Sequence, residues 1–160
     1  MNIKFFLLIT TLFLTLTSVA NAHVESVSTI NGSTSLNNTQ YDSLQVNGSL
    51  AFENLSIKEL LNVNGTIAGK QLNCKTLKVD GSLDVEGLQT QDVEVNGSFV
   101  GKNIEVTGQV IVNGSIVIKS GKLNDVEIAS YSASFVNSKI LGNVLIKKSS
   151  GNGELFFRRK

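Results

Sequence analysis

Paired carboxyl groups are the most evident candidates for catalytic side chains in this sequence. Sugar-cleaving β-helical enzymes use two acidic side chains together, or hold calcium with them. Here five acidic residues fall within fifteen positions, but lysines alternate with them, and they occupy outward-facing or corner positions. This pattern favours a solvated face of mixed charge over a catalytic pair. The five residues are Asp80, Asp84, Glu86, Asp92 and Glu94.

Residues that often act as nucleophiles or metal ligands are scarce. His23 is the only histidine and Cys74 the only cysteine among 160 residues. One histidine does not complete a Ser-His-Asp, Cys-His or zinc arrangement, nor the two-histidine copper site that an amino-terminal histidine could begin. Cys74 falls in a mostly apolar column, so we expect it in the core as a small side chain. The sequence therefore predicts a protein that is not an enzyme and holds no metal or cofactor.

A tetrapeptide of the form [VI]-[ND]-G-[ST] recurs six times, and its glycines lie sixteen or seventeen positions apart. Asn-Gly is also a strong hairpin signal, and most copies are formal acceptors for N-glycosylation. Asp80 occupies the asparagine position of one copy, where it turns the chain equally well but cannot carry a glycan. The repeat therefore favours a structural corner. The six glycines are Gly32, Gly48, Gly65, Gly81, Gly97 and Gly114.

Each corner needs a residue that tolerates positive φ beside one without a Cβ, and Asn-Gly or Asp-Gly supplies both. If repeats stack, the amides of successive corners lie above one another and hydrogen-bond as a ladder, with Asn96 directly over Asn113. The predicted structural corners are Asn47 with Gly48, Asn64 with Gly65, Asp80 with Gly81, Asn96 with Gly97 and Asn113 with Gly114.

Apolar residues recur in fixed columns relative to these glycines. One repeat of short period-2 segments cannot bury its apolar face alone, whereas stacked repeats align the columns into one core. We therefore predict an all-β, single-domain parallel β-helix, or β-solenoid, of six to seven coils. A sandwich of hairpins is the alternative, but hairpins do not require the same residue types at such a constant interval. One such column contains Leu44, Leu61, Leu77, Val93 and Val110.

The first 22 residues have the pattern of a secretory signal peptide. Lys4 precedes an uncharged apolar run from Phe5 to Val19, and a small-residue segment ends at Ala22. The run of about 15 residues is shorter than the roughly 20 that span a membrane. We predict cleavage after Ala22 and export to the periplasm, the cell surface or the medium. Without Lys4 the chain keeps 13 basic and 13 acidic residues, which gives no electrostatic reason to bind nucleic acid.

The remaining boundaries follow from composition. We predict the solenoid over residues 23–148, with 23–43 as a capping coil, since Ser28 and Thr39 replace apolar residues there. Residues 149–160 are predicted to form a flexible break and an apolar, basic tail. In that tail Phe156 and Phe157 either fold back as a lid over the last coil or contact another subunit.

The stretches LKVDGSLDVEGLQTQDVEVNGSFVGKNIEV and SKILGNVLIKK resemble the short valine-glycine coils of bactofilins. These are polymer-forming cytoskeletal proteins of bacteria, built on a right-handed parallel β-helix. The resemblance extends over roughly Leu44 to Lys148. It implies end-to-end assembly without nucleotide, and the predicted signal peptide moves such a scaffold outside the cytoplasm.

Three functions are therefore compared. The first is an exported, non-enzymatic structural solenoid that self-associates end to end and contacts the cell envelope or surface, with no small-molecule substrate. The second is a surface adhesin or ligand-binding solenoid, although the outer positions are short and polar rather than aromatic. The third is a polysaccharide-active β-helical enzyme, which the scattered acidic residues disfavour.

Overall fold

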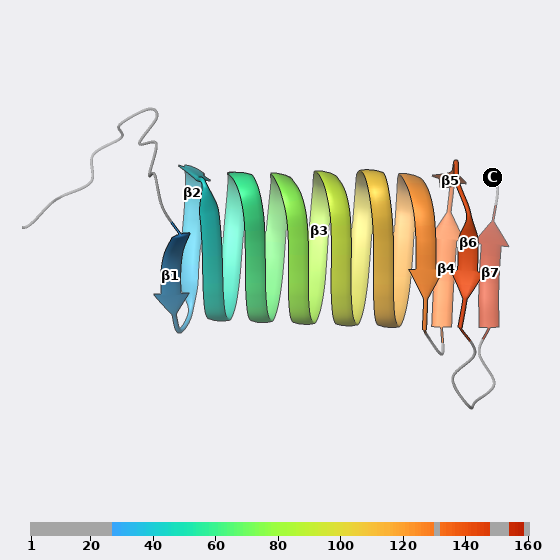
Figure 1. Ribbon diagram of the computed structural model, residues 1–160, viewed down its shortest axis with the longest axis horizontal. Coiled ribbons are helices and arrows are strands. Elements are labelled where there is room, and N and C mark those ends of the chain that lie inside the picture. The colour runs from blue at the N-terminus through green and yellow to red at the C-terminus, as the bar shows by residue number, and fades with distance from the viewer. Residues whose placement is uncertain (1–26, 130–131, 148–153, 159–160) are drawn as a thin grey trace, which may run out of the picture.

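The structure is a computed structural model that describes residues 27–129, 132–147 and 154–158, the last range for its backbone alone. These residues form strands and no helix, so none of them belongs to a helix able to cross a membrane. The longest strand winds around the rod as one continuous ribbon (Figure 1). The strands are β1 (Val27–Asn31), β2 (Thr34–Tyr41), β3 (Ser43–Ile128), β4 (Ser132–Val136), β5 (Lys139–Ile140), β6 (Val144–Ile146) and β7 (Glu154–Arg158).

Successive turns pair in parallel. Val27 of β1 lies beside Ser43 of β3, which is sixteen positions later in the chain. Ile116 of β3 lies beside Ala133 of β4, which is seventeen positions later. The predicted all-β solenoid is confirmed, with about seven turns of about 16 residues. The hairpin sandwich is wrong, because the pairings between the described strands are parallel.

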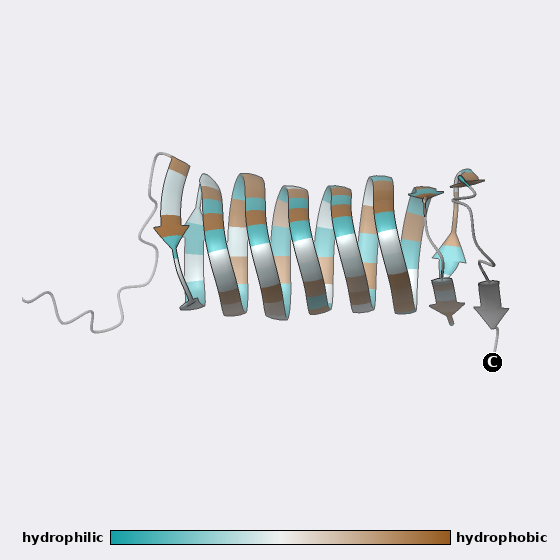
Figure 2. Ribbon diagram, turned by 90° about the horizontal axis from the view of Figure 1, so that it is seen from below, coloured by the Kyte–Doolittle hydropathy of each residue, from teal (hydrophilic) through white to brown (hydrophobic). Residues whose placement is uncertain are grey.

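Each side of the rod contributes a set of apolar columns to the core. Along β3, buried and outward-facing side chains alternate between corners, so that three short segments of each turn point inward. In the turn that begins at Gly65 these segments bury Ile67, then Leu72 and Cys74, then Leu77. Bands of polar and apolar residues accordingly recur at matching places on neighbouring turns (Figure 2).

Large core residues are matched by glycine one turn away. The ring of Phe52 and its carbonyl oxygen fill the space that a Cβ on Gly69 would need. Gly101 is crowded by Ile118 from the next turn and by Ile104 from its own turn. At these two levels glycine makes room for a bulky neighbour, whereas other core positions stack large residues directly, as Ile118 does beside Phe135.

Turns that differ in length by one residue stack without loss of register, because the extra residue lies outside the core. Three residues separate the buried Ile57 from Leu61, whereas two separate Cys74 from Leu77. Both spacings occur at the corner between the second and third inward segments. This third corner therefore accepts a loop of either length while the apolar columns stay aligned.

The two ends of the rod differ. At the first turn, Ser28 pairs with Leu44 and Thr39 pairs with Leu55, so polar residues stand in core columns. At the far end β5 and β6 lie on β3, while β7 lies on β4 (Figure 1). The predicted signal peptide and the predicted break over 149–153 lie outside the described residues.

Substitution of Val95 tests the register of the core. Val95 is fully buried, whereas Val100 is 42 % exposed on the outside of the same turn. We expect Val95→Asp to lower the free energy of unfolding by about 3–5 kcal/mol, because it leaves an unpaired charge in the core. Urea unfolding followed by circular dichroism measures the change, with Val100→Asp as the control. Equal stability of the two variants would contradict the register.

Candidate functional site

At the Asn-Gly corner the glycines of successive turns stack with no room for a side chain. Gly65, Gly81 and Gly97 have φ values of 140°, 142° and 145°. A Cβ added to any of them would overlap the carbonyl oxygen of the corner glycine one turn earlier. Glycine is required here for two reasons, its backbone conformation and the lack of space.

The asparagines beside these glycines form a ladder of side-chain hydrogen bonds. Asn113 Nδ2 donates to Asn96 Oδ1 over 2.7 Å, and Asn96 Nδ2 donates to Asp80 Oδ1 over 2.6 Å. Near the first turn, Asn47 Nδ2 donates to Asn31 Oδ1 over 2.8 Å. Each amide points toward the amino-terminal neighbour. The structure thus places Asn96 next to Asn113, as stacking requires.

Asp80 ends one segment of this ladder. Its carboxylate accepts from Asn96 but has no N–H to pass on toward the preceding turn. The side chain of Asn64 neither accepts from Asp80 nor donates to Asn47, and it has no hydrogen bond to the described part of the chain. The ladder therefore has two separate runs, with Asn64 between them.

The expectation that the corner asparagines adopt positive φ is wrong. In the described ranges the positive φ of this corner lies at the glycine alone. The asparagine contributes its amide to the ladder, and the adjoining glycine makes the turn. Asparagine is thus selected here by stacking, since the backbone does not need its tolerance of the left-handed region.

A second corner, which the sequence analysis missed, holds the non-glycine residues with positive φ. Their φ values lie between 51° and 60°, and Gly87 in the same column has φ 80°. The signal was present as a column rich in asparagine at the same interval as the corner glycines, since asparagine tolerates this conformation. The column contains Asn38, Asn54, Gln71, Gly87, Asn103, Ser120 and Asn137.

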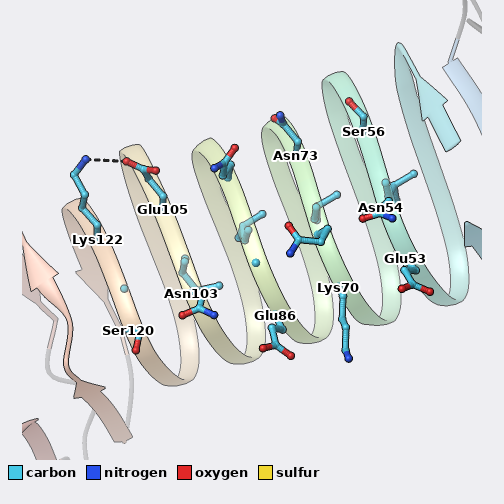
Figure 3. A pocket seen from close by; sticks show the side chains of 18 of the residues that line it. Glu53, Asn54, Ser56, Lys70, Asn73, Glu86, Asn103, Glu105, Ser120 and Lys122 are labelled. Carbon is cyan, nitrogen blue, oxygen red and sulfur yellow. Dashed lines mark hydrogen bonds and ion pairs between the residues drawn. The ribbon is translucent and has the colours of Figure 1, made fainter. Parts of the chain in front are cut away.

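A polar groove of about 1030 Å³ follows this second corner along the rod. Figure 3 shows Asn54, Asn103 and Ser120 along its middle, between two rows of outward side chains. Gly87 leaves room for Gln71, whose amide lies against it. One flanking row contains Glu53, Lys70 and Glu86, and the other contains Ser56, Asn73, Gln89, Glu105 and Lys122.

Charges along the groove are arranged in opposite pairs between turns. Lys122 Nζ lies 2.8 Å from Glu105 Oε1, the contact drawn in Figure 3. Lys102 Nζ lies 2.6 Å from Glu86 Oε1, and its hydrogen bond is the main reason that the pKa of Glu86 is lowered. Stacking opposite charges in neighbouring turns avoids the repulsion that identical charges would produce.

The five acidic residues of the sequence cluster are not brought together as a catalytic site. Glu94 pairs with Lys78 over 2.9 Å, and Asp92 Oδ1 accepts from the backbone N–H of Gln109 over 2.9 Å. No group of three histidine, cysteine, aspartate or glutamate side chains in the described ranges is placed to hold a metal ion. Four of the five, namely Asp80, Glu86, Asp92 and Glu94, make contacts with a neighbouring turn.

Cys74 lies in the core, where the sequence placed it. Its side chain is 3 % exposed, and its sulfur contacts Thr90 Oγ1 at 3.6 Å. Burial raises the pKa of the thiol to about 11, and the hydrogen bond with Thr90 opposes part of this rise. Thr90 Oγ1 also lies 3.0 Å from the backbone oxygen of Lys75, to which it donates. This environment keeps Cys74 a neutral thiol at physiological pH.

The carboxy-terminal phenylalanines lie on a strand at the end of the rod. In β7, Phe156 stands beside Ser134 of β4 and Phe157 stands beside Phe135. The backbone of β7 therefore covers one of the strands in the last turn. Whether these residues also contact a second subunit stays a prediction.

Comparison of the chain with models of protein families, with curated proteins and with solved structures finds no match. The solenoid shape alone does not identify bactofilins, so this resemblance stays a prediction.

A matched pair of alanine substitutions separates backbone strain from steric overlap at the corner. Gly32 and Gly81 both have positive φ, but a Cβ meets nothing within 4 Å at Gly32, whereas it overlaps Gly65 at Gly81. We expect Gly32→Ala to cost about 1 kcal/mol and Gly81→Ala to cost about 3 kcal/mol or more. Urea unfolding measures both variants. Equal losses would show that close approach between turns does not select glycine.

The buried thiol predicts a pH dependence of stability. Because the pKa of Cys74 rises from 9.0 to about 11 on folding, the unfolded chain loses its thiol proton first. Stability from this group is present below pH 9 and is lost between pH 9 and about 11. We expect a decrease of about 1–3 kcal/mol in unfolding free energy over this range. Cys74→Ala should show a shallower pH dependence, and an unchanged slope would contradict the assignment.

Proposed function

We propose that this chain is an exported, non-enzymatic structural solenoid that associates end to end into a scaffold or filament. The observation that supports it most is the contrast between the sides of the rod and its ends. Along the sides, backbone groups pair between turns and core columns are covered. At the ends, strand edges and core columns are left open in the described residues.

The carboxy-terminal face exposes apolar side chains of the core columns. Val144 continues the core column of Val126, and Ile146 continues that of Ile128. In the described structure nothing stacks on this strand, so Val144 is 41 % exposed and Ile146 is 45 % exposed. Exposed core residues beside an open strand edge favour addition of another strand.

The amino-terminal face can supply that strand from a second copy. β1 pairs with β3 along one edge only, and its Ile30 occupies the same column as Ile128 and Ile146. If β1 of one copy is added to β6 of another in the same parallel register, Ile30 covers Ile146 and Ser28 covers Val144. Such a head-to-tail contact does not close on itself, so it propagates into a filament.

The side chains also favour a structural role over catalysis. Described acidic residues such as Glu59, Glu94 and Glu105 pair with lysines one turn away instead of converging on one point. Export rests on the predicted signal peptide, which places the rod where it can contact the cell envelope or surface. The resemblance to bactofilins supports the same mode of assembly.

Substitution at the end of the rod tests the assembly. Light scattering and negative-stain microscopy of the chain from His23 onward should show rods whose mass increases with concentration. Ile146→Lys should shift the protein strongly toward monomers, because it places a charge in the apolar contact with Ile30. Val100→Lys is the control, since Val100 is 42 % exposed on the side of the rod. Monodisperse monomers at all concentrations would refute the proposal.

A further inference from the structure

We propose that the groove along the second corner binds a neutral, linear polysaccharide that lies parallel to the rod axis. This inference is independent of end-to-end assembly, because the groove is on the side of the rod, away from the open strand edges. It adds a ligand class that a structural solenoid does not require.

The groove carries amides that the protein leaves unused. The side chains of Asn73, Gln89 and Asn103 line it, and they make no hydrogen bond to the described part of the chain. The amides of the Asn-Gly corner are different, since Asn96 and Asn113 are occupied by the ladder. At the second corner Asn54 Nδ2 donates to Asn38 Oδ1 over 2.9 Å, so stacking uses one amide of the groove and leaves those of Asn73, Gln89 and Asn103 open.

These amides suit sugar hydroxyl groups. A carboxamide presents an acceptor and two donors in one plane, so it can bind two neighbouring hydroxyl groups of a pyranose ring at once. One such polar row is repeated with each turn, at the roughly 4.7–4.9 Å that separates paired strands. This spacing is close to the length of one sugar unit in an extended glycan, so successive turns meet successive sugars.

Charge favours a neutral glycan over a charged one. Three carboxylates and two lysines line the groove, and Glu105 and Glu86 are already paired with lysines. With Lys102 paired to Glu86, the charges at the groove balance, so a polyanion gains no net attraction there. The lining residues are Glu53, Glu86, Glu105, Lys70 and Lys122.

The lining also disfavours an extended polypeptide. The apolar residues beneath the groove, such as Leu55, Leu72 and Leu88, are at most 2 % exposed. They leave no pocket for peptide side chains, and the strand edges along the rod are already paired between turns. A polypeptide would therefore find neither apolar contacts nor backbone partners here.

Binding through amides alone is weak at each turn, because no aromatic residue lines the groove for stacking on a sugar ring. Affinity then has to accumulate over several turns. Each further sugar that reaches the next turn binds at a high effective concentration. A long glycan should consequently bind, whereas a disaccharide of the same composition should bind poorly.

Affinity electrophoresis tests this proposal. The purified protein is run in native gels that contain mixed-linkage β-glucan, arabinoxylan, galactomannan, alginate or gelatin. The variant Asn73→Ala/Gln89→Ala/Asn103→Gly removes the three amides, and glycine at 103 keeps the positive φ. The control Ser49→Ala/Thr66→Ala/Ser82→Ala removes three exposed hydroxyl groups beside the other corner. Circular dichroism verifies that both variants are folded.

We expect at least one neutral polysaccharide to retard the protein and the control, while the groove variant migrates freely. A hexasaccharide of that polymer should compete about tenfold better than the disaccharide at equal sugar concentration. Four results would overturn the proposal. They are no retardation by any neutral polysaccharide, equal or stronger retardation by alginate or gelatin, unchanged retardation of the groove variant, and equal competition by the two oligosaccharides.

Discussion

The distance between turns constrains every side chain of this rod. Parallel backbone pairing holds neighbouring turns at roughly 4.7–4.9 Å, so each residue lies directly above its equivalent in the next turn. At the Asn-Gly corner this distance excludes any side chain at the glycine. On the outer faces it brings like positions within hydrogen-bonding range, as between Asn113 and Asn96.

Two rules for the columns follow from this distance. Neutral amides can repeat, because each one donates to the next. Opposite charges pair between turns, as where Lys75 lies 2.7 Å from Glu59 one turn earlier, although Lys122 and Lys139 are neighbours with the same charge. Hydrogen bonding and attraction from Glu59 raise the pKa of Lys75. Exposed pairs of this kind contribute little stability individually, but a shift of one turn would place like charges together, so they help to specify register.

Much of the fold could be predicted from the sequence, because the core columns consist of one residue class at constant spacing. Leu61, Leu77 and Val93 are all apolar, so their column can be recognised in the sequence. The second corner was missed because residues as different as Gln71, Gly87 and Ser120 share only a backbone conformation. The groove was missed with it, since its location follows from that corner. The φ values of the asparagines at the Asn-Gly corner were predicted wrongly, because asparagine is favoured both by a ladder of side-chain hydrogen bonds and by a turn with positive φ.

The tolerance of the third corner has a consequence for how such a protein can change over generations. Deletion of one residue between Ile57 and Leu61, or insertion of one between Cys74 and Leu77, stays outside the apolar columns, as the two natural spacings show. Duplication of a whole turn also preserves every stacking rule, because each turn contacts only its neighbours. Rod length is therefore a variable that gene duplication can adjust one turn at a time, lengthening the groove along the side while the two end faces stay unchanged.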